Sequence, residues 1–354
     1  MTTLATRAPA TRTHASAPLL SVSNLVKHFP VRGGILNRVI GNVHAVNGVS
    51  FSVNKGEIVG VVGESGCGKS TLGKAVIRLS EPTSGSILFD GTDITRLSHA
   101  ELMPFRRRMQ IIFQDPYSSL NPRLTVRKLL REAIQFHNIV PPEHHESYID
   151  ELIAKVGLRR DAKDKFPHEF SGGQRQRLGI ARALALKPEF LIADEPVSAL
   201  DVSIQAQVLN LMMDLKREFG LTILFISHDL KVIEHFCDRV LVMYLGHIVE
   251  SLPCDDLHTR ARHPYTRALL GANPIDDPDQ RGSRPLTILQ GDVPSPFNPP
   301  KGCAFAGRCP HVLDRCRSDR PVLEPRDDGH HVACWADAAD PTPGNSSPVP
   351  PTTA

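Results

Sequence analysis

A glycine-rich turn between an apolar run and a helical pattern constrains the fold of this chain more than any other feature. The apolar residues 58–62 lead into Gly63-Glu64-Ser65-Gly66-Cys67-Gly68-Lys69-Ser70, which completes the pattern G-x-x-x-x-G-K-[ST]. In such a strand–loop–helix unit, backbone N–H groups surround phosphate oxygens, the lysine reaches the β- and γ-phosphates, and the serine hydroxyl binds Mg²⁺. The sequence therefore predicts a site for a nucleoside triphosphate, with Lys69 and Ser70 in these two roles.

The composition is that of an ordinary soluble protein that is large enough for two domains. The 354 residues are 41% hydrophobic and 22% charged, with a net charge of only +3. The basic residues are dispersed, which argues against nucleic acid as the main partner. No apolar stretch reaches the roughly 18 residues that a membrane span requires, and Met1–Pro18 lacks the apolar segment of a secretory signal. We expect a cytoplasmic protein that reaches a membrane only through a partner.

Apolar runs without alternation, interleaved with helical patterns, predict an α/β core. We expect one sheet buried on both faces, with strands at residues 58–62, 109–113, 190–193, 221–226 and 240–243. Two β-branched runs ahead of the glycine-rich turn, 19–29 and 48–53, predict an antiparallel β-subdomain. Residues 32–43, which lie between these runs and hold several glycines, are expected to form a loop.

Composition also predicts the domain boundaries. A core domain is expected over residues 19–260, with a helical subdomain over about 115–187 inside it. Past residue 260 proline becomes frequent and long apolar runs end, which predicts a small Cys/Pro-rich C-terminal module over residues 261–336. The two ends of the chain, 1–18 and 337–354, are expected to be disordered tails.

Polar side chains end three of the predicted strands. Because the carboxyl ends of parallel strands meet at one sheet edge, we expect Gln114, His228 and the pair Asp194-Glu195 beside the glycine-rich turn. Asp194 suits an Mg²⁺ site, Glu195 suits a group that orients or deprotonates the attacking water, and the Gln114 amide could contact either. Taken alone, an Asp-Glu pair at a strand end is ordinarily a solvated turn, and a lone histidine there is ordinarily structural.

A second anion site is indicated at the start of a predicted helix. Ser171-Gly172-Gly173-Gln174 would present free backbone N–H groups at the positive end of the helix dipole. The alternative is a serine N-cap followed by flexible glycines. Since the chain already has one phosphate loop, we interpret the second site as evidence for a dimer, in which the Ser171 end of each chain closes over the nucleotide of the other.

The order of these motifs resembles that of the ATPases of ABC transporters, over roughly residues 19–260. The motifs that carry the resemblance are the P-loop, Gln114, Ser171-Gly172-Gly173-Gln174, Asp194-Glu195, Ser198-Ala199-Leu200-Asp201 and His228. It implies hydrolysis of ATP, with Glu195 as the general base, Gln114 as a sensor and His228 at the γ-phosphate. It also implies Mg²⁺ on Ser70, Gln114 and Asp194.

The same resemblance implies the other contacts of the nucleotide. Adenine would stack on Phe29. The phosphates would lie on the loop residues Gly63, Ser65, Gly66, Cys67, Gly68, Lys69, Ser70 and Thr71. Contacts across a dimer would come from Ser171, Gly172, Gly173, Gln174 and Asp201.

Residues 63–68 of the P-loop most resemble the second of the two paralogous ATPases of the oligopeptide/dipeptide importers, and three further segments resemble the same importers. They are Phe113–Arg123, His263-Pro264-Tyr265-Thr266 and the Pro/Cys-rich tail. The resemblance implies a peripheral protein on the cytoplasmic face of the cell membrane that powers peptide import. Its partners would be a paralogous ABC ATPase in a heterodimer, two transmembrane permease subunits that face the segment after Gln114, and an extracytoplasmic substrate-binding protein. Nickel chelates or other solutes remain alternatives to peptides.

Four of the seven cysteines crowd into the tail, at Cys303, Cys309, Cys316 and Cys334. In a cytosolic chain such a cluster indicates a metal before disulfides. The close C-x-x-C pairs of zinc sites are absent, whereas four thiolates can hold a [4Fe–4S] cluster, as they do in some ATPases of the resembled family. Zn²⁺, with help from His311, His330 or His331, is the alternative, and buried structural thiols are a third reading.

Two other classes of ABC ATPase fit the sequence less well. Soluble ABC ATPases of translation usually carry two cassettes, and those of DNA repair insert a long coiled coil, whereas this chain has one cassette and no sustained heptads. An exporter ATPase would leave the tail after residue 260 unexplained.

Overall fold

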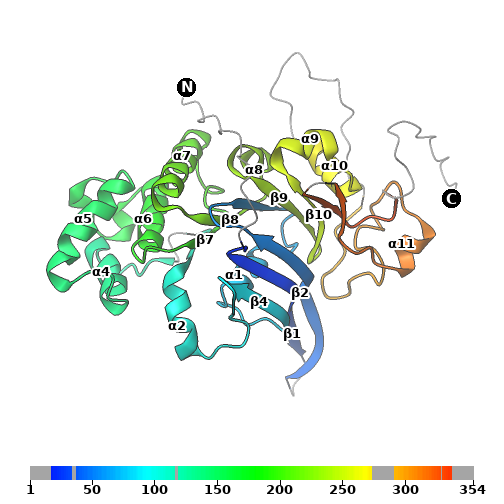
Figure 1. The fold of residues 1–354 in the computed structure, drawn as a ribbon, viewed down its shortest axis with the longest axis horizontal. Coiled ribbons are helices and arrows are strands. Elements are labelled where there is room, and N and C mark those ends of the chain that lie inside the picture. Colours follow the sequence, from blue (N-terminus) through cyan, green and yellow to red (C-terminus); the bar gives the residue numbers. More distant parts are fainter. Residues whose placement is uncertain (1–16, 34–36, 116–118, 273–290, 328, 337–354) are drawn as a thin grey trace, which may run out of the picture.

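The computed structural model describes residues 17–33, 37–115, 119–272, 291–327 and 329–336 (Figure 1). The strands are β1 Leu20–Gly33, β2 Arg38–Val53, β3 Ile58–Val62, β4 Ser84–Phe89, β5 Thr92–Asp93, β6 Met109–Ile112, β7 Phe190–Asp194, β8 Thr222–Ser227, β9 Arg239–Tyr244, β10 His247–Pro253, β11 Glu324–Asp327 and β12 His330–Val332. The α-helices are α1 Lys69–Val76, α2 His99–Arg108, α4 Val126–Phe136, α5 His145–Lys155, α6 Gly172–Leu184, α7 Val202–Phe219, α8 Leu230–Phe236, α9 Leu257–Arg260, α10 Pro264–Ala272 and α11 Asp314–Ser318. Short 3₁₀ turns are η1 Pro142–His144, η2 Arg160–Asp164, η3 Pro167–Glu169 and η4 Cys254–Asp256.

A large mixed sheet forms the centre of the molecule. Among the described residues its strand order is β11-β12-β10-β9-β3-β8-β7-β6. The pairs from β9 through β3, β8 and β7 to β6 are parallel, and every residue of β3, β7 and β8 is buried. This confirms the predicted sheet with two covered faces, since apolar residues on both faces of a strand need cover on both.

The C-terminal segment, defined here as residues 291–336, extends this sheet. Its strand β12 pairs antiparallel with β10 and with β11. Residues 273–290, the predicted tail 337–354 and most of the predicted tail 1–18 lie outside the described residues. In Figure 1 the segment is drawn in orange and red, at the opposite end of the molecule from α4 and α5.

A second sheet, with strand order β2-β1-β4-β5, carries the antiparallel β-subdomain. The predicted loop over residues 32–43 was wrong, because β1 continues to Gly33 and β2 already begins at Arg38. Register shifts interrupt the β1–β2 pairing, so the sequence shows no period of two that would reveal the strands. A Cβ at Gly41 would lie 2.2 Å from the Phe297 ring, so this glycine allows the C-terminal segment to approach β2.

The helical region between β6 and β7 holds α4, α5 and α6, as the sequence predicts. Val126, Leu130 and Ile134 recur every four residues on α4 and are fully buried, which is the spacing of one helix face. Tyr148 on α5 packs into the same core, and its hydroxyl donates to the carbonyl of Ala185 at the end of α6, at 3.2 Å.

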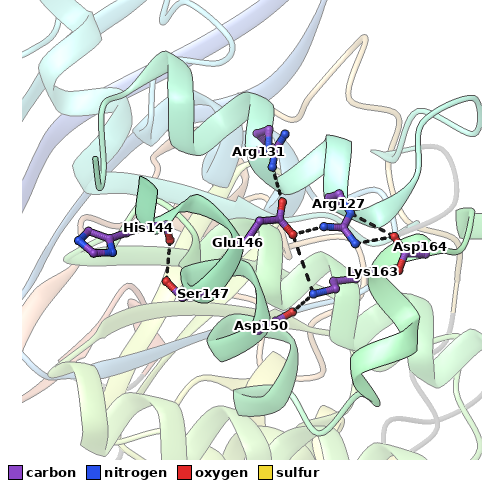
Figure 2. Close-up of polar contacts among 8 residues, drawn as sticks. All are labelled: Arg127, Arg131, His144, Glu146, Ser147, Asp150, Lys163 and Asp164. Carbon is purple, nitrogen blue, oxygen red and sulfur yellow. Dashed lines mark hydrogen bonds and ion pairs between the residues drawn. The ribbon is translucent and has the colours of Figure 1, made fainter. Parts of the chain in front are cut away.

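An ion network joins α4, α5 and η2 (Figure 2). Arg127 and Arg131 of α4 both donate to the Glu146 carboxylate of α5. Lys163 of η2 bonds Asp150 and lies 3.9 Å from Glu146. Three cations thus surround one carboxylate, and the network fixes how the two helices lie against each other.

We expect Glu146→Gln to lower the free energy of unfolding by about 1 kcal/mol, because it leaves Arg127, Arg131 and Lys163 without their shared anion. Urea unfolding followed by circular dichroism measures the change. Glu143→Gln is the matched control, because Glu143 forms no ion pair with any of the described residues. Part of the loss should vanish in high salt, which screens these half-exposed charges; an equal loss for both variants would contradict the network's role.

Among the described residues, no helix is both long enough and apolar enough to cross a membrane.

Candidate nucleotide-binding and catalytic site

The P-loop connects the buried strand β3 to helix α1, as the sequence predicts. Gly68, at the N-terminus of α1, has a φ of 107°, and a Cβ there would lie 2.0 Å from the Ala45 carbonyl oxygen. Only glycine satisfies both constraints. No side chain caps α1, so the N–H groups of its first turn remain available to an anion.

Lys69 is a buried cation held by two carbonyl oxygens and, at longer range, by the Cys67 thiol. Its Nζ donates to the carbonyls of Gly63 at 2.7 Å and Glu64 at 3.0 Å, and the residue is only 5% exposed. The described part of the chain provides no carboxylate in an ion pair with it. A buried charge without a counter-ion is costly, so the site favours an incoming anion such as a phosphate.

The other loop residues differ in exposure. Ser65 and Gly66 are exposed at the tip of the loop, and Thr71 is half-buried in α1. Cys67 is 3% exposed, with its Sγ 3.9 Å from the Lys69 Nζ, and burial raises the pKa of its thiol. Cys67 is therefore a packing residue of the loop.

Ser70 and Asp194 meet at the end of β7. The Ser70 hydroxyl donates to Asp194 Oδ1 at 2.7 Å, and Asp194 is 2% exposed. Burial raises the pKa of this carboxyl above its ordinary value, because the charged form loses hydration. A buried carboxylate beside a hydroxyl suits a small divalent cation with oxygen ligands, so the residues present fit the Mg²⁺ that the sequence predicts here.

Glu195 is contacted by both of the other strand-end residues. Gln114 Nε2 donates to its Oε2 at 3.1 Å, and His228 Nδ1 lies 3.2 Å from the same oxygen. These residues follow the ends of three strands, β6, β7 and β8, and the fold brings their side chains together. Glu195 has a φ of 46°, a strained conformation for a non-glycine residue, of the kind that occurs at functional sites.

Phe29 lies on β1 and is 41% exposed, with the Lys27 ammonium 4.8 Å from the centre of its ring. A large exposed aromatic ring on a β-strand can stack on a planar base. No ligand contact places it at the site, so its role stays a prediction.

The Ser171 end of α6 is a capped and exposed helix N-terminus. Ser171 Oγ accepts from the Gln174 N–H at 3.4 Å, and the Gln174 Oε1 accepts from the Ser171 N–H at 3.0 Å. Ser171, Gly172 and Gln174 are exposed, whereas Gly173 is buried, and a Cβ there would lie 2.6 Å from Ile204 on α7. The capping box that was the alternative reading is thus present, and it leaves this end of the helix open to a partner.

The loop before α7 is held by a residue that the sequence analysis missed. Gln205 Nε2 donates to the carbonyls of Val197 at 3.0 Å and Leu200 at 2.9 Å, which fixes the loop that ends at Asp201. The next residue, Val202, is an apolar side chain that is 82% exposed. A rigid loop with an exposed valine is consistent with a contact surface.

The four clustered cysteines are not joined by disulfides, and the thiols of Cys303 and Cys309 interact electrostatically with other cysteines of the cluster. Burial, together with the nearby Cys303, Cys316 and Cys334, raises the pKa of Cys309 to about 11. The Cys303 N–H donates to the Cys316 carbonyl at 2.8 Å. Nevertheless, the described residues contain no group of three or more His, Cys, Asp or Glu side chains placed to hold a metal ion. The predicted metal site is therefore not preformed among the described residues. The raised pKa values of Cys303 and Cys309 keep these two thiols protonated until a metal displaces the protons.

Comparison with known proteins matches two parts of the chain to known families. Residues 46–198 match the ABC transporter family, and residues 249–316 match the C-terminal region of oligopeptide/dipeptide transporters. The probable peptide ABC transporter ATP-binding protein y4tS of Sinorhizobium fredii is 53% identical over 319 residues, which cover 90% of this chain and 90% of that protein. The oligopeptide transport ATP-binding protein AppF of Bacillus subtilis is 52% identical over 319 residues, which cover 89% and 96%.

Solved structures show the same core. The post-hydrolysis dimer of the ATP-binding cassette MJ0796, bound to ADP and Pi, has a TM-score of 0.59 and 28% identity, and covers 66% of this chain and 98% of that one. CbiO1 of Clostridium perfringens, part of the CbiONQ ABC transporter complex, has a TM-score of 0.58 and 28% identity, and covers 69% and 91%.

The fold and the site define an ATPase of the ABC class. The P-loop lies at the sheet edge where Asp194, Glu195, Gln114 and His228 converge, and a helical region carries the exposed Ser171 end. Because two family models match and the relatives described above are more than 50% identical in sequence, the chain belongs to the ATP-binding proteins of the oligopeptide/dipeptide ABC transporters.

Proposed function

We propose that this chain hydrolyses ATP to power the import of di- or oligopeptides across the cytoplasmic membrane. The main support for ATP hydrolysis is that Gln114 and His228 both contact one carboxylate oxygen of Glu195. The observation that carries the peptide part is the match of residues 249–316 to the C-terminal region of oligopeptide/dipeptide transporters. The same match argues against the function of a soluble ABC ATPase, because the matched region is one described for transporters.

In the proposed reaction the P-loop binds the phosphates and Glu195 acts on the water. Lys69 would exchange its two carbonyl partners for phosphate oxygens, while Phe29 stacks on adenine. Glu195 would orient or deprotonate the attacking water, with His228 at the γ-phosphate and Gln114 reporting its presence. Mg²⁺, held by Ser70, Gln114 and Asp194, would neutralise charge on the β- and γ-phosphates.

A dimer would complete the site. We propose that Ser171, Gly172, Gly173 and Gln174 of one subunit cover the nucleotide of the other, with Asp201 between the two sites. The support is that this helix end and Val202 are exposed on the single chain. The related cassette MJ0796 was solved as a dimer. ATP-driven closure and reopening of the dimer would then move the membrane partners.

The proposed partners are a paralogous ATPase, two permease subunits and an extracytoplasmic substrate-binding protein, which would place the chain on the cytoplasmic face of the membrane. The test reconstitutes the chain with these partners in proteoliposomes and follows ATP hydrolysis and uptake of a labelled peptide. We expect both to rise with the peptide-loaded binding protein. If peptides leave the rate of ATP hydrolysis unchanged and a nickel chelate raises it, the transported solute is the nickel chelate and not a peptide.

We further propose that Cys303, Cys309, Cys316 and Cys334 take up a [4Fe–4S] cluster, with Zn²⁺ as the alternative. The support is that four cysteines occur in one short segment poor in apolar residues, and that Cys303 and Cys309 interact electrostatically with other cysteines of this group. The cluster would supply cross-links that hold this segment together. Anaerobic purification with analysis for iron, sulfide and zinc tests this: a colourless and metal-free protein would leave the thiols as packing residues.

A further inference from the structure

Every polar group of one P-loop residue has a partner, and two of the partners come from far along the chain. The Glu64 N–H donates to the Tyr265 hydroxyl oxygen at 2.8 Å. The two terminal nitrogens of Arg308 donate to the two carboxylate oxygens of Glu64, at 2.7 and 3.1 Å. The Glu64 carbonyl accepts from Lys69 at 3.0 Å. Glu64 is therefore the point at which α10 and the C-terminal segment hold the phosphate-binding loop.

These partners are themselves fixed by packing. Tyr265, Tyr244 and Phe305 are at most 1% exposed, and their rings contact one another with centroids 4.7 to 5.4 Å apart. The Arg308 side chain is 8% exposed, and its Nη1 lies 3.4 Å from the Tyr244 hydroxyl. A bidentate pair with one partner so buried is more strongly held than a surface ion pair.

A buried carboxylate on the central sheet anchors the start of α10. Glu250 of β10 is fully buried and accepts from the backbone N–H of Arg262 at 2.7 Å and of His263 at 3.2 Å. His330 of β12 lies 2.8 Å from the same carboxylate. The His263-Pro264-Tyr265 turn is thus tied to the sheet, which gives the Tyr265 hydroxyl a fixed position under the P-loop.

We propose that Tyr265 and Arg308 are positioning residues that hold the P-loop in its nucleotide-binding shape through Glu64, so that the C-terminal segment sets the affinity for nucleotide. The inference rests on the proposed binding of ATP at this loop. Because the loop is already ordered, a nucleotide need not pay for ordering it. Arg308 also neutralises a carboxylate that would otherwise repel the phosphates.

The proposal predicts that removing the charge of Arg308 and removing the charge of Glu64 change the Kd for nucleotide by different amounts. Arg308→Gln leaves Glu64 as an uncompensated anion beside the phosphates, so we expect about a tenfold higher Kd. Glu64→Gln loses the clamp but also the repulsive charge, so about a two- to threefold rise is expected. The double variant should lie closer to Glu64→Gln than to Arg308→Gln, which a general structural defect would not produce.

The measurement is calorimetric titration of the full chain with ADP, a product nucleotide that the chain does not consume. Tyr265→Phe keeps the packed ring and removes only the hydroxyl, and we expect about a threefold higher Kd from it. Arg315→Gln is the control, since Arg315 lies over the Trp335 ring, 3.6 Å from its centroid, in the same segment. It should leave the Kd unchanged.

Stoichiometry separates positioning from misfolding. A misfolded fraction lowers the number of sites per chain, whereas loss of positioning raises Kd at one site per chain. Wild-type Kd values for both Arg308→Gln and Tyr265→Phe, or a double variant weaker than Arg308→Gln, would overturn the proposal. Absence of ADP binding by the wild-type chain would instead overturn the proposed function.

Discussion

Glu195→Gln is expected to slow ATP hydrolysis by about 10²- to 10⁴-fold, the range that a positioned general base contributes, while ATP still binds. The substitution keeps an acceptor oxygen for Gln114 and removes the carboxylate that His228 and Gln114 contact, at 3.2 and 3.1 Å. ATP should then persist in the site and hold the dimer closed. Phosphate release measures the rate, and light scattering after size-exclusion chromatography measures the dimer.

Glu189→Gln is the matched control for this variant. Glu189 precedes the same strand, β7, at its other end and pairs with Arg108 at 2.5 Å. A loss of ATP hydrolysis that results from destabilising strand β7 should appear in both variants. A loss that results from removing the general base should appear only in Glu195→Gln. Hydrolysis by Glu195→Gln near the wild-type rate would remove Glu195 as the base.

Lys69→Ala is expected to abolish nucleotide binding. Lys69 is the buried cation that has no carboxylate partner in the described structure, so its charge is available to the phosphates. Calorimetric titration with ATP and Mg²⁺ should show no binding heat. Lys55→Ala serves as control, because Lys55 pairs with Asp90 on the surface at 3.2 Å and lies before β3. Tight ATP binding by Lys69→Ala would contradict the assignment of the P-loop.

The two variants also separate binding from chemistry. If Lys69→Ala fails to bind and Glu195→Gln binds without turnover, the loop and the strand ends act at successive steps. A melting temperature close to that of the wild type is needed for both, since the P-loop lies on the central sheet. Stabilisation by ATP should then appear for Glu195→Gln and be lost for Lys69→Ala.

The nucleotide site was predictable because its parts are local or follow a general rule of sheets. Residues 63–70 are consecutive, so the loop is encoded in one short pattern. Glu195, Gln114 and His228 follow the ends of different strands, and the carboxyl ends of parallel strands share one edge. The convergence of these three side chains therefore follows from the sequence once the strands are recognised.

The hairpin and the arrangement of the four cysteines were less predictable for physical reasons. The β1–β2 pair is irregular, with shifted register, so the stretch around Gly41 carries no alternation. For the cysteines, spacing along the chain does not fix the positions of thiols in a segment with few apolar residues. The raised pKa values of Cys303 and Cys309 keep these thiols neutral, and the described residues by themselves do not define a metal site.

The sequence by itself determined the class of this protein: the P-loop, the polar strand ends and the apolar runs specify a phosphate-binding α/β ATPase. Only the tertiary structure decided what holds the loop. Tyr265 and Arg308 lie 201 and 244 residues from Glu64 along the chain, and no local pattern marks either as its partner. Local motifs encode backbone conformation over a few residues, whereas contacts between distant segments depend on how the whole core packs.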